Sequence, residues 1–192
     1  LQATDAAVQR TALQRTLQGC DRAAHLVDQL LMLARLEADA HPVHSKVDLA
    51  AVLRRVVGDL APHAISRSQQ LVLDAPPTLP VRGHETLLAA LLRNLVDNAI
   101  RYTGEGGHVR VVASVHEERV RVEVEDDGPG MAADERARLG ERFFRVLGHE
   151  AGGSGLGWSI VRRIARLHEL AVDVTQGAHG RGLCVALEWP PA

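Results

Sequence analysis

Two asparagines one helical turn apart, Asn94 and Asn98, have the types and spacing that could support chemistry. Arg101 and Tyr102 follow them, and steps of three and four residues bring these side chains together on a helix. Carboxamide oxygens can coordinate a divalent cation that keeps several waters. The guanidinium can bind a phosphate oxygen, and the aromatic ring can cover a planar base. A surface helix carrying two solvated asparagines is the competing interpretation.

A second candidate is the segment 126–131, Asp-Asp-Gly-Pro-Gly-Met, which follows an expected strand. The carboxylate of Asp126 at a strand end can accept a hydrogen bond from the exocyclic amine of adenine. Gly128 and Gly130 let the backbone turn sharply beside such a base. Taken alone, this segment is better explained as an ordinary Asp-Gly turn.

A third candidate is the glycine-rich segment 152–157, which precedes an expected helix. Consecutive backbone amides at a helix start can bind an anion, and glycine lets phosphates approach closely. The segment differs from a dinucleotide-binding fingerprint because no parallel strand leads directly into it and no acidic residue stands at the ribose position. Gly180-Arg181-Gly182, before the last expected strand, is a further possible turn.

The pattern of residues 47–192 predicts an α/β domain that positions these candidates. An apolar stripe on the central helix is formed by Leu88, Leu91, Leu95 and Ala99. Helices are expected at 49–66, 85–102 and 157–168, and strands at 47–49, 71–73, 109–115, 120–124, 172–175 and 183–187, with a loop at 75–83. These elements predict a two-layer sandwich in which a mixed, mostly antiparallel sheet packs on helices.

Residues 1–40 are expected to form a separate helical segment, joined through a linker at 38–46. Its heptad pattern consists of Leu13, Leu17, Cys20, Ala24, Val27, Leu31 and Ala34. Leu26, Leu30 and Leu33 widen this stripe, which favours a four-helix bundle made by two chains. Packing of a long amphipathic helix on its own domain is the alternative.

Composition excludes several classes of function. The 192 residues carry a formal net charge of −2, which argues against nucleic-acid binding. No apolar run reaches the length of a membrane span, and no signal peptide is evident. Lys46 is the only lysine and follows no glycine-rich loop. A P-loop and the strand lysine of eukaryotic-type protein kinases are therefore both excluded.

In this order and spacing, the motifs together resemble the ATP-binding domain of bacterial sensor histidine kinases. Residues 94–102 are similar to that family's N box, 126–130 to its first glycine box and 153–157 to its second. Residues 180–182 are similar to the third glycine box, and 141–145 to the F box. The helical segment around 21–31 resembles the second helix of the dimerisation and phosphotransfer hairpin. The resemblance implies a Bergerat-type ATP-binding fold.

The resemblance also implies a role for each motif residue. Asp126 would hold the adenine amine, with Gly128, Gly130 and Met131 shaping that wall. Asn98 would ligate magnesium, and Asn94 would assist at the metal or the phosphates. Arg101 would meet phosphate, and Tyr102 would pack beside the base or ribose. Gly153, Gly155 and Gly157 would contact the phosphates, and Leu156 and Gly182 would also belong to the cofactor site. Arg142 or Arg145 would reach the γ-phosphate from a lid at 146–152.

Some residues depart from the family pattern. The earlier phenylalanine of the F box is Gly140 here, and His84-Glu85 stands where an Asp is usual. The phosphoacceptor box, a His-Glu followed by a Pro, is not found. His168-Glu169 lacks the Pro and lies after the phosphate loop, whereas His25 belongs to the second hairpin helix. The chain is therefore expected to begin after the phosphorylatable histidine and to transfer phosphate only to an acceptor on another chain.

The expected function is the catalytic part of a two-component histidine kinase that uses ATP and Mg²⁺. Gyrase-type and mismatch-repair ATPases are disfavoured, because their glutamate base stands where this chain has Asn94, and a carboxamide cannot abstract a proton from water. A nucleotide-binding dimerisation module without kinase activity is the alternative. The resemblance implies a homodimer, a cognate response regulator as partner, and a parent protein anchored in the bacterial inner membrane with this portion in the cytoplasm. The stimulus and the particular response regulator are not predicted.

Overall fold

The structure is a computed structural model that describes residues 44–139 and 156–190, together with Thr16, Val27 and Leu31. The chain divides into two compact units, Leu1–Ala38 and Asp39–Ala192. In the first unit, the three described residues are helical, and the apolar side chains of Val27 and Leu31 are exposed.

The second unit contains both helices and strands. In order, they are β1 (Ser45–Asp48), α2 (Leu49–Ser66), β2 (Gln70–Asp74), β3 (Pro80–Gly83), α3 (Glu85–Tyr102), β4 (His108–His116), β5 (Arg119–Asp126), α4 (Ala133–Ala137), α5 (Gly157–Leu167), β6 (Ala171–Gln176) and β7 (Leu183–Glu188). A short 3-10 turn, Ala178–Gly180, lies between the last two strands.

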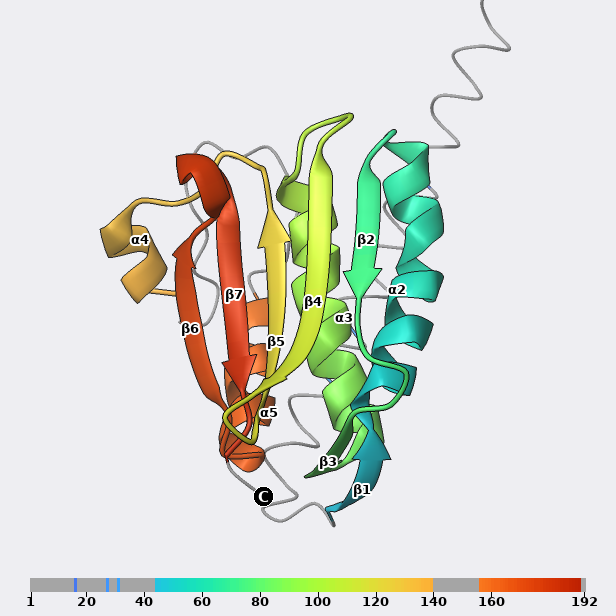
Figure 1. Ribbon diagram of the computed structural model, residues 1–192. Coiled ribbons are helices and arrows are strands. Elements are labelled where there is room, and N and C mark those ends of the chain that lie inside the picture. Colours follow the sequence, from blue (N-terminus) through green and yellow to red (C-terminus); the bar gives the residue numbers. More distant parts are fainter. Residues whose placement is uncertain (1–15, 17–26, 28–30, 32–43, 140–155, 191–192) are drawn as a thin grey trace, which may run out of the picture. The chain divides into compact units, whose positions relative to one another are not determined.

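The main sheet has five strands in the order β2-β4-β5-β7-β6. Strands β2 and β4 run parallel, and each of the other neighbouring pairs is antiparallel. Helices α2, α3 and α5 lie on one face of this sheet (Figure 1). A second sheet pairs β1 with β3. The predicted two-layer sandwich with a mixed, mostly antiparallel sheet is confirmed.

The hydrophobic core lies between this sheet and the helices. The apolar stripe predicted for α3 is buried, with Leu88 and Leu91 fully inaccessible. On β4, Val109 and Val111 are buried, whereas the residues between and before them are exposed. This alternation is expected of a strand with one covered face, because successive side chains point to opposite sides. The core therefore fixes which face of α3 is available for the polar residues.

Asp48 joins β1, α2 and the segment before β3. Its Oδ1 accepts hydrogen bonds from the backbone amides of Ala50, at 3.1 Å, and Leu79, at 2.9 Å. The bond from Leu79 holds the pKa of the Asp48 carboxyl below its usual value. The first of these bonds is a helix N-cap, which satisfies an amide that has no partner within the helix.

Three details differ from the sequence prediction. The predicted strand at 47–49 ends earlier, because Leu49 already begins α2. The predicted loop at 75–83 contains β3, whose partner β1 lies far back in the sequence. Pro80 opens this strand, a position where proline is tolerated. Helix α4 was not predicted. No described helix is both long and apolar enough to cross a membrane.

Candidate functional site

The two asparagines of α3 face the start of α5. A Cβ atom placed on Gly157 would lie 2.9 Å from Asn94 Oδ1 and 3.6 Å from Asn98 Nδ2. Glycine therefore allows the first turn of α5 to approach both carboxamides. Asn94 Nδ2 donates a hydrogen bond to the Ala90 carbonyl at 2.8 Å, which turns Asn94 Oδ1 toward Gly157. The arrangement places two carboxamides, with the oxygen of Asn94 nearest, beside the start of a helix, a combination suited to a cation and its phosphates.

Arg101 forms an ion pair with Asp97, one helical turn earlier on α3. Arg101 Nη2 lies 2.8 Å from Asp97 Oδ2, and both side chains are largely buried. The guanidinium is thus held along the helix in this structure. Its contact with phosphate stays a prediction, and Asp97 is an addition to the residues that the sequence analysis singled out.

Asp126 ends β5 and is partly buried. Its Oδ1 accepts a hydrogen bond from the Gly128 amide at 3.0 Å. Burial raises the pKa of this carboxyl to about 6, although hydrogen bonds from the amides of Gly128 and Leu183 oppose the rise. The neighbouring carboxylates of Asp127 and Glu125 raise the pKa further. At neutral pH Asp126 is still mainly a carboxylate, which accepts hydrogen bonds from an amine.

Glycines bring two loops into backbone contact beside Asp126. The Gly182 amide donates to the Gly128 carbonyl at 2.8 Å, and the Gly177 amide donates to the Gly182 carbonyl at 3.1 Å. Gly182 has φ of +66°, and a Cβ atom there would overlap the Asp126 carbonyl oxygen. Gly130, with φ of +74°, also packs against Gly182. The first glycine motif and the Gly180-Arg181-Gly182 turn therefore form one structural unit.

A cavity of about 30 Å³ lies between α3, the sheet and the first turn of α5. It is lined by Leu95, Asn98, Ala99, Tyr102, Val124, Asp126, Met131, Trp158, Leu183 and Val185. The structure thus brings four predicted residues, Asn98, Tyr102, Asp126 and Met131, around one space. That volume holds roughly one or two waters, so a planar base can enter only if the wall opens.

Several lining residues were not predicted from sequence. Trp158 follows the last glycine of the 152–157 motif, and Leu183 follows Gly182. Each of them directly follows a glycine motif, and this position was the only sequence signal that could have indicated a place in the site. An apolar side chain in such a place is not distinguishable in sequence from one that belongs to the core.

The phosphate segment is only partly described. Leu156 is buried, and Gly157 begins α5 next to the asparagines. The other predicted residues of this region, Arg142, Arg145, Gly153 and Gly155, lie outside the described residues.

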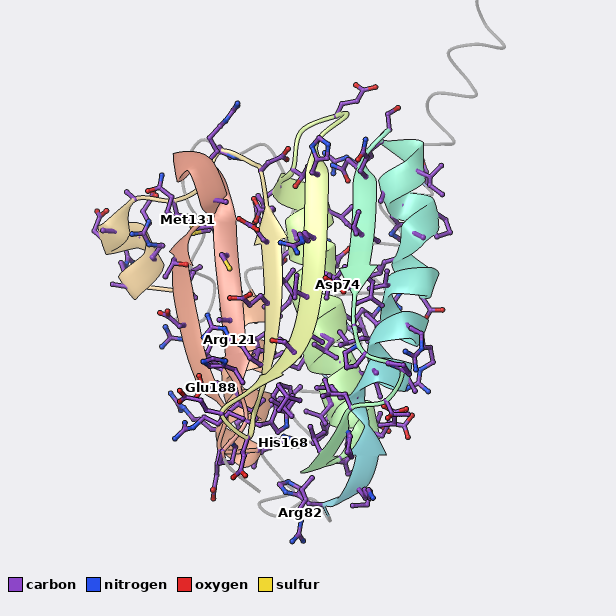
Figure 2. All side chains as sticks on the ribbon, in the orientation of Figure 1. Asp74, Arg82, Arg121, Met131, His168 and Glu188 are labelled. Atoms are coloured by element: carbon purple, nitrogen blue, oxygen red, sulfur yellow. The ribbon has the colours of Figure 1, made fainter. Side chains whose placement is uncertain are left out.

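Met131 lies near α4, and His168 lies toward the opposite end of the domain (Figure 2).

Comparison with known proteins identifies the family. Residues 83–192 match the family described as "Histidine kinase-, DNA gyrase B-, and HSP90-like ATPase". The chain belongs to this family. Its similarity to sensor histidine kinases, expected from the motifs, is confirmed by individual relatives.

Two sensor proteins and one solved structure illustrate that similarity. Sensor protein QseC of Escherichia coli O157:H7 is 39% identical over 191 residues, which cover 96% of this chain and 40% of QseC. Sensor protein kinase PmrB of Pseudomonas aeruginosa is 35% identical over 196 residues, covering 99% of this chain and 40% of PmrB. The crystal structure of full-length ShkA in complex with AMPPNP matches with a TM-score of 0.77 and 33% identity, covering 95% of this chain and 38% of ShkA. The histidine kinase-like chain thus spans about 40% of the length of these sensor proteins.

Proposed function

We propose that this chain binds ATP with Mg²⁺ and donates the γ-phosphoryl group to a histidine, for relay to an aspartate of a response regulator. The observation that supports this most is the cavity in which the partly buried Asp126 carboxylate meets Asn98 and Tyr102. The AMPPNP bound to ShkA, which shares this fold, supports the same assignment. The sensor-protein names of the relatives support a place in two-component signalling.

The side chains around the cavity suit the chemistry of an adenine, which enters once the wall opens. The Asp126 carboxylate accepts a hydrogen bond from the exocyclic amine, with its geometry set by the Gly128 amide at 3.0 Å. Met131 and Tyr102 provide apolar and aromatic surfaces for the base or ribose. Gly130, with its positive φ, turns the chain back against Gly182 and keeps this wall close to the base. These residues bind and orient the nucleotide without taking part in bond breaking.

The face shared by α3 and α5 fits a metal and phosphates. Asn98 would hold Mg²⁺ through its carboxamide oxygen, with Asn94 beside it, and the amides near Leu156 and Gly157 would contact phosphate oxygens. When bound, Mg²⁺ neutralises charge on the transferring phosphoryl group. Asn94 cannot act as a general base for water, so the site favours transfer over hydrolysis. We assign Arg101, Gly153 and Gly155 to phosphate contacts, Arg142 or Arg145 to the γ-phosphate, and Gly182 to the nucleotide wall beside Asp126.

The proposal includes a homodimer and a membrane-anchored parent protein. Val27 and Leu31 belong to the heptad pattern, are helical and have exposed side chains, as a dimer seam requires before its partner packs. A cognate response regulator is the proposed partner, and the described portion would act in the cytoplasm. The family resemblance of the helical segment supports these points.

Calorimetric titration with ATP tests the proposal directly. The chain is expected to bind ATP, and to bind it more tightly with Mg²⁺. Asp126→Ala should raise the dissociation constant roughly 10- to 100-fold, since a hydrogen bond to a charged group is lost. Asp74→Ala is the matched control, because Asp74 also ends a strand of the same sheet but is exposed and pairs with Arg110 at 3.8 Å.

The outcomes separate the two candidate functions. Magnesium-dependent ATP binding that Asp126→Ala weakens and Asp74→Ala leaves unchanged supports the kinase site. Transfer of phosphate from radiolabelled ATP to an added dimerisation hairpin that carries the acceptor histidine then tests the reaction itself. Binding without transfer favours the nucleotide-binding dimerisation module. A folded chain that binds no ATP overturns the proposal.

A further inference from the structure

The C-terminal end of α3 is held by two side chains from the short connection between α2 and β2. Arg67 donates from Nη1 to the Arg101 carbonyl at 3.2 Å and from Nη2 to the Thr103 carbonyl at 3.1 Å. Gln69 Nε2 lies 3.0 Å from the Ile100 carbonyl oxygen, 2.8 Å from that of Thr103 and 3.0 Å from that of Gly104. The last carbonyls of a helix have no partner within it, so these donors supply what α3 lacks.

The geometry of Gln69 is determined by its surroundings. The residue is only 6% exposed, and its Oε1 has no hydrogen-bond partner within the described part of the chain. Reversing the amide would place this oxygen against three carbonyl oxygens, so only the NH₂ group can face the helix end. Arg67 adds a positive charge at the same place, where the helix dipole favours a cation. The arrangement fixes the last turn of α3 strongly.

This last turn forms part of the candidate nucleotide site. Tyr102 lies between the residues whose carbonyls are held, and its ring lines the cavity with Asp126. The Tyr102 carbonyl oxygen would lie 2.7 Å from a Cβ atom on Gly128, so the helix end packs directly on the first glycine motif. A displacement of the helix end would therefore move Tyr102 relative to Asp126.

A second set of contacts links the turn after α3 to the same segment. A Cβ atom on Gly107 would lie 2.6 Å from Thr103 Cγ2 and 2.5 Å from Asp127 Oδ1. The Asp127 carboxylate also accepts from the His108 amide at 2.9 Å and lies 3.0 Å from His108 Nδ1. The helix end, the following turn and the residue next to Asp126 thus pack without spare volume.

We propose that Arg67 and Gln69 are positioning residues for the nucleotide site. Neither side chain lines the cavity. They act through α3, by holding its last turn so that Tyr102 and Asn98 keep their distance from Asp126. The inference rests on the proposed function, because nucleotide affinity is the property that this positioning serves.

The test compares Arg67→Met with Arg54→Met. Arg54 is the matched control because it also donates to two loop carbonyls, Pro76 at 3.3 Å and Pro77 at 2.9 Å, but lies away from the cavity. Arg67→Met should raise the dissociation constant of Mg-ATP about 3- to 30-fold, whereas Arg54→Met should leave it within about twofold. Arg67→Lys, which keeps one charged donor, should restore part of the affinity. Gln69→Leu should act in the same direction if it folds.

A spectroscopic measurement reports the position of the helix end independently of nucleotide. Tyr102 is the only tyrosine of the chain, so fluorotyrosine labelling gives a single ¹⁹F resonance. Arg67→Met should shift or broaden this resonance without nucleotide, and Arg54→Met should not, with both variants measured well below their unfolding temperatures.

The outcomes distinguish this inference from the proposed function. If the unsubstituted chain binds no ATP, the proposed function fails, while the ¹⁹F comparison still decides whether Arg67 holds the helix end. An unchanged resonance in Arg67→Met overturns the positioning inference. Equal losses of affinity in Arg67→Met and Arg54→Met also overturn it, because they would reflect general destabilisation.

Discussion

Asp126, which is partly buried, and His168, which is buried, are titratable residues toward opposite ends of the domain, and their partners differ. His168 is 4% exposed, with Nδ1 2.9 Å from the Ile164 carbonyl oxygen and Nε2 accepting from the His84 amide at 3.0 Å. Its ring also stacks on His44 at a centroid distance of 4.6 Å. Both ring nitrogens are therefore satisfied by the protein itself.

Asp126 is satisfied in a different way. Its carboxylate accepts from the Gly128 amide but also lines a cavity beside polar and aromatic side chains. Desolvation moves both residues toward their neutral forms, raising the pKa of Asp126 and lowering that of His168. Burial and a shifted pKa thus do not by themselves indicate a binding residue. A cavity adjoins both residues, since His168 lines a larger one together with His44 and Trp189. The distinguishing feature is that both ring nitrogens of His168 are bonded within the protein, whereas the Asp126 carboxylate can accept further hydrogen bonds.

The largest effect is expected from a substitution that forces apart the two glycine loops beside Asp126. A Cβ atom in Gly182→Ala would overlap the Asp126 carbonyl oxygen, so the two loops must separate. We expect a loss of about 3 kcal/mol or more in the free energy of unfolding, measured by denaturant titration, together with weaker ATP binding.

Gly180→Ala is the matched control for that prediction. Gly180 has φ of +72°, similar to the +66° of Gly182, but a Cβ atom placed on it would meet nothing within 4 Å in the described part of the chain beyond its own neighbours. Gly180→Ala should therefore lower the free energy of unfolding only by the cost of placing a side chain at a positive φ, about 1 kcal/mol. Equal losses in the two variants would show that close packing at Asp126 is unimportant.

The second prediction concerns His168, the other residue of the comparison. His168→Ala removes a buried ring and two hydrogen bonds, so it should lower the free energy of unfolding by about 2–4 kcal/mol. ATP affinity, measured by calorimetry on the folded protein, should stay within about twofold. His116→Ala is the control, because that side chain is exposed, and its stability should change by no more than about 0.5 kcal/mol. Loss of ATP binding in His168→Ala would assign His168 to the site.

The sequence predicted the local surroundings of Asp126 better than those of His168. Asp126 precedes two glycines at a strand end, and this local pattern predicts a turn with a carboxylate whether or not the fold is known. The partners of His168 come from Ile164 nearby and from His84, far away in sequence. Only the tertiary structure brings the latter contact, so the sequence could not predict the hydrogen bonds of His168.

The same distinction between local and distant contacts explains the elements that were missed. Helix α3 was predicted with its observed bounds, 85–102, because its apolar stripe is a local pattern. Strand β3 was missed because its strand character depends on pairing with β1. Arg67 and Gln69 were also missed, since nothing nearby in sequence indicates that they reach the end of α3. Local patterns predicted the helix and its polar face, but not what holds its last turn.

The smallest expected effect is a difference in pH dependence. The pKa of Asp126 rises from 3.8 to about 6 on folding, so the folded state binds the proton more tightly. Its contribution to stability is present at low pH and is lost as pH rises from about 4 to about 6. The shift corresponds to no more than about 3 kcal/mol, and on the order of 1–2 kcal/mol remains after allowance for residual solvent screening.

His168 should show the opposite dependence over an overlapping pH range. Folding lowers its pKa below 6.5 through burial, with His44 and His84 adding to the effect. Its contribution is therefore present above pH 6.5 and is lost as pH falls toward the folded-state value. Denaturant titrations from pH 4 to 8 on the unsubstituted chain, Asp126→Asn and His168→Ala give the two contributions by difference. Relative to Asp126→Asn, the unsubstituted chain should lose stability as pH rises, and relative to His168→Ala it should gain stability. Difference curves with the same sign would mean that Asp126 and His168 do not differ electrostatically, which leaves the remaining hydrogen-bonding capacity of the Asp126 carboxylate as the physical distinction between them.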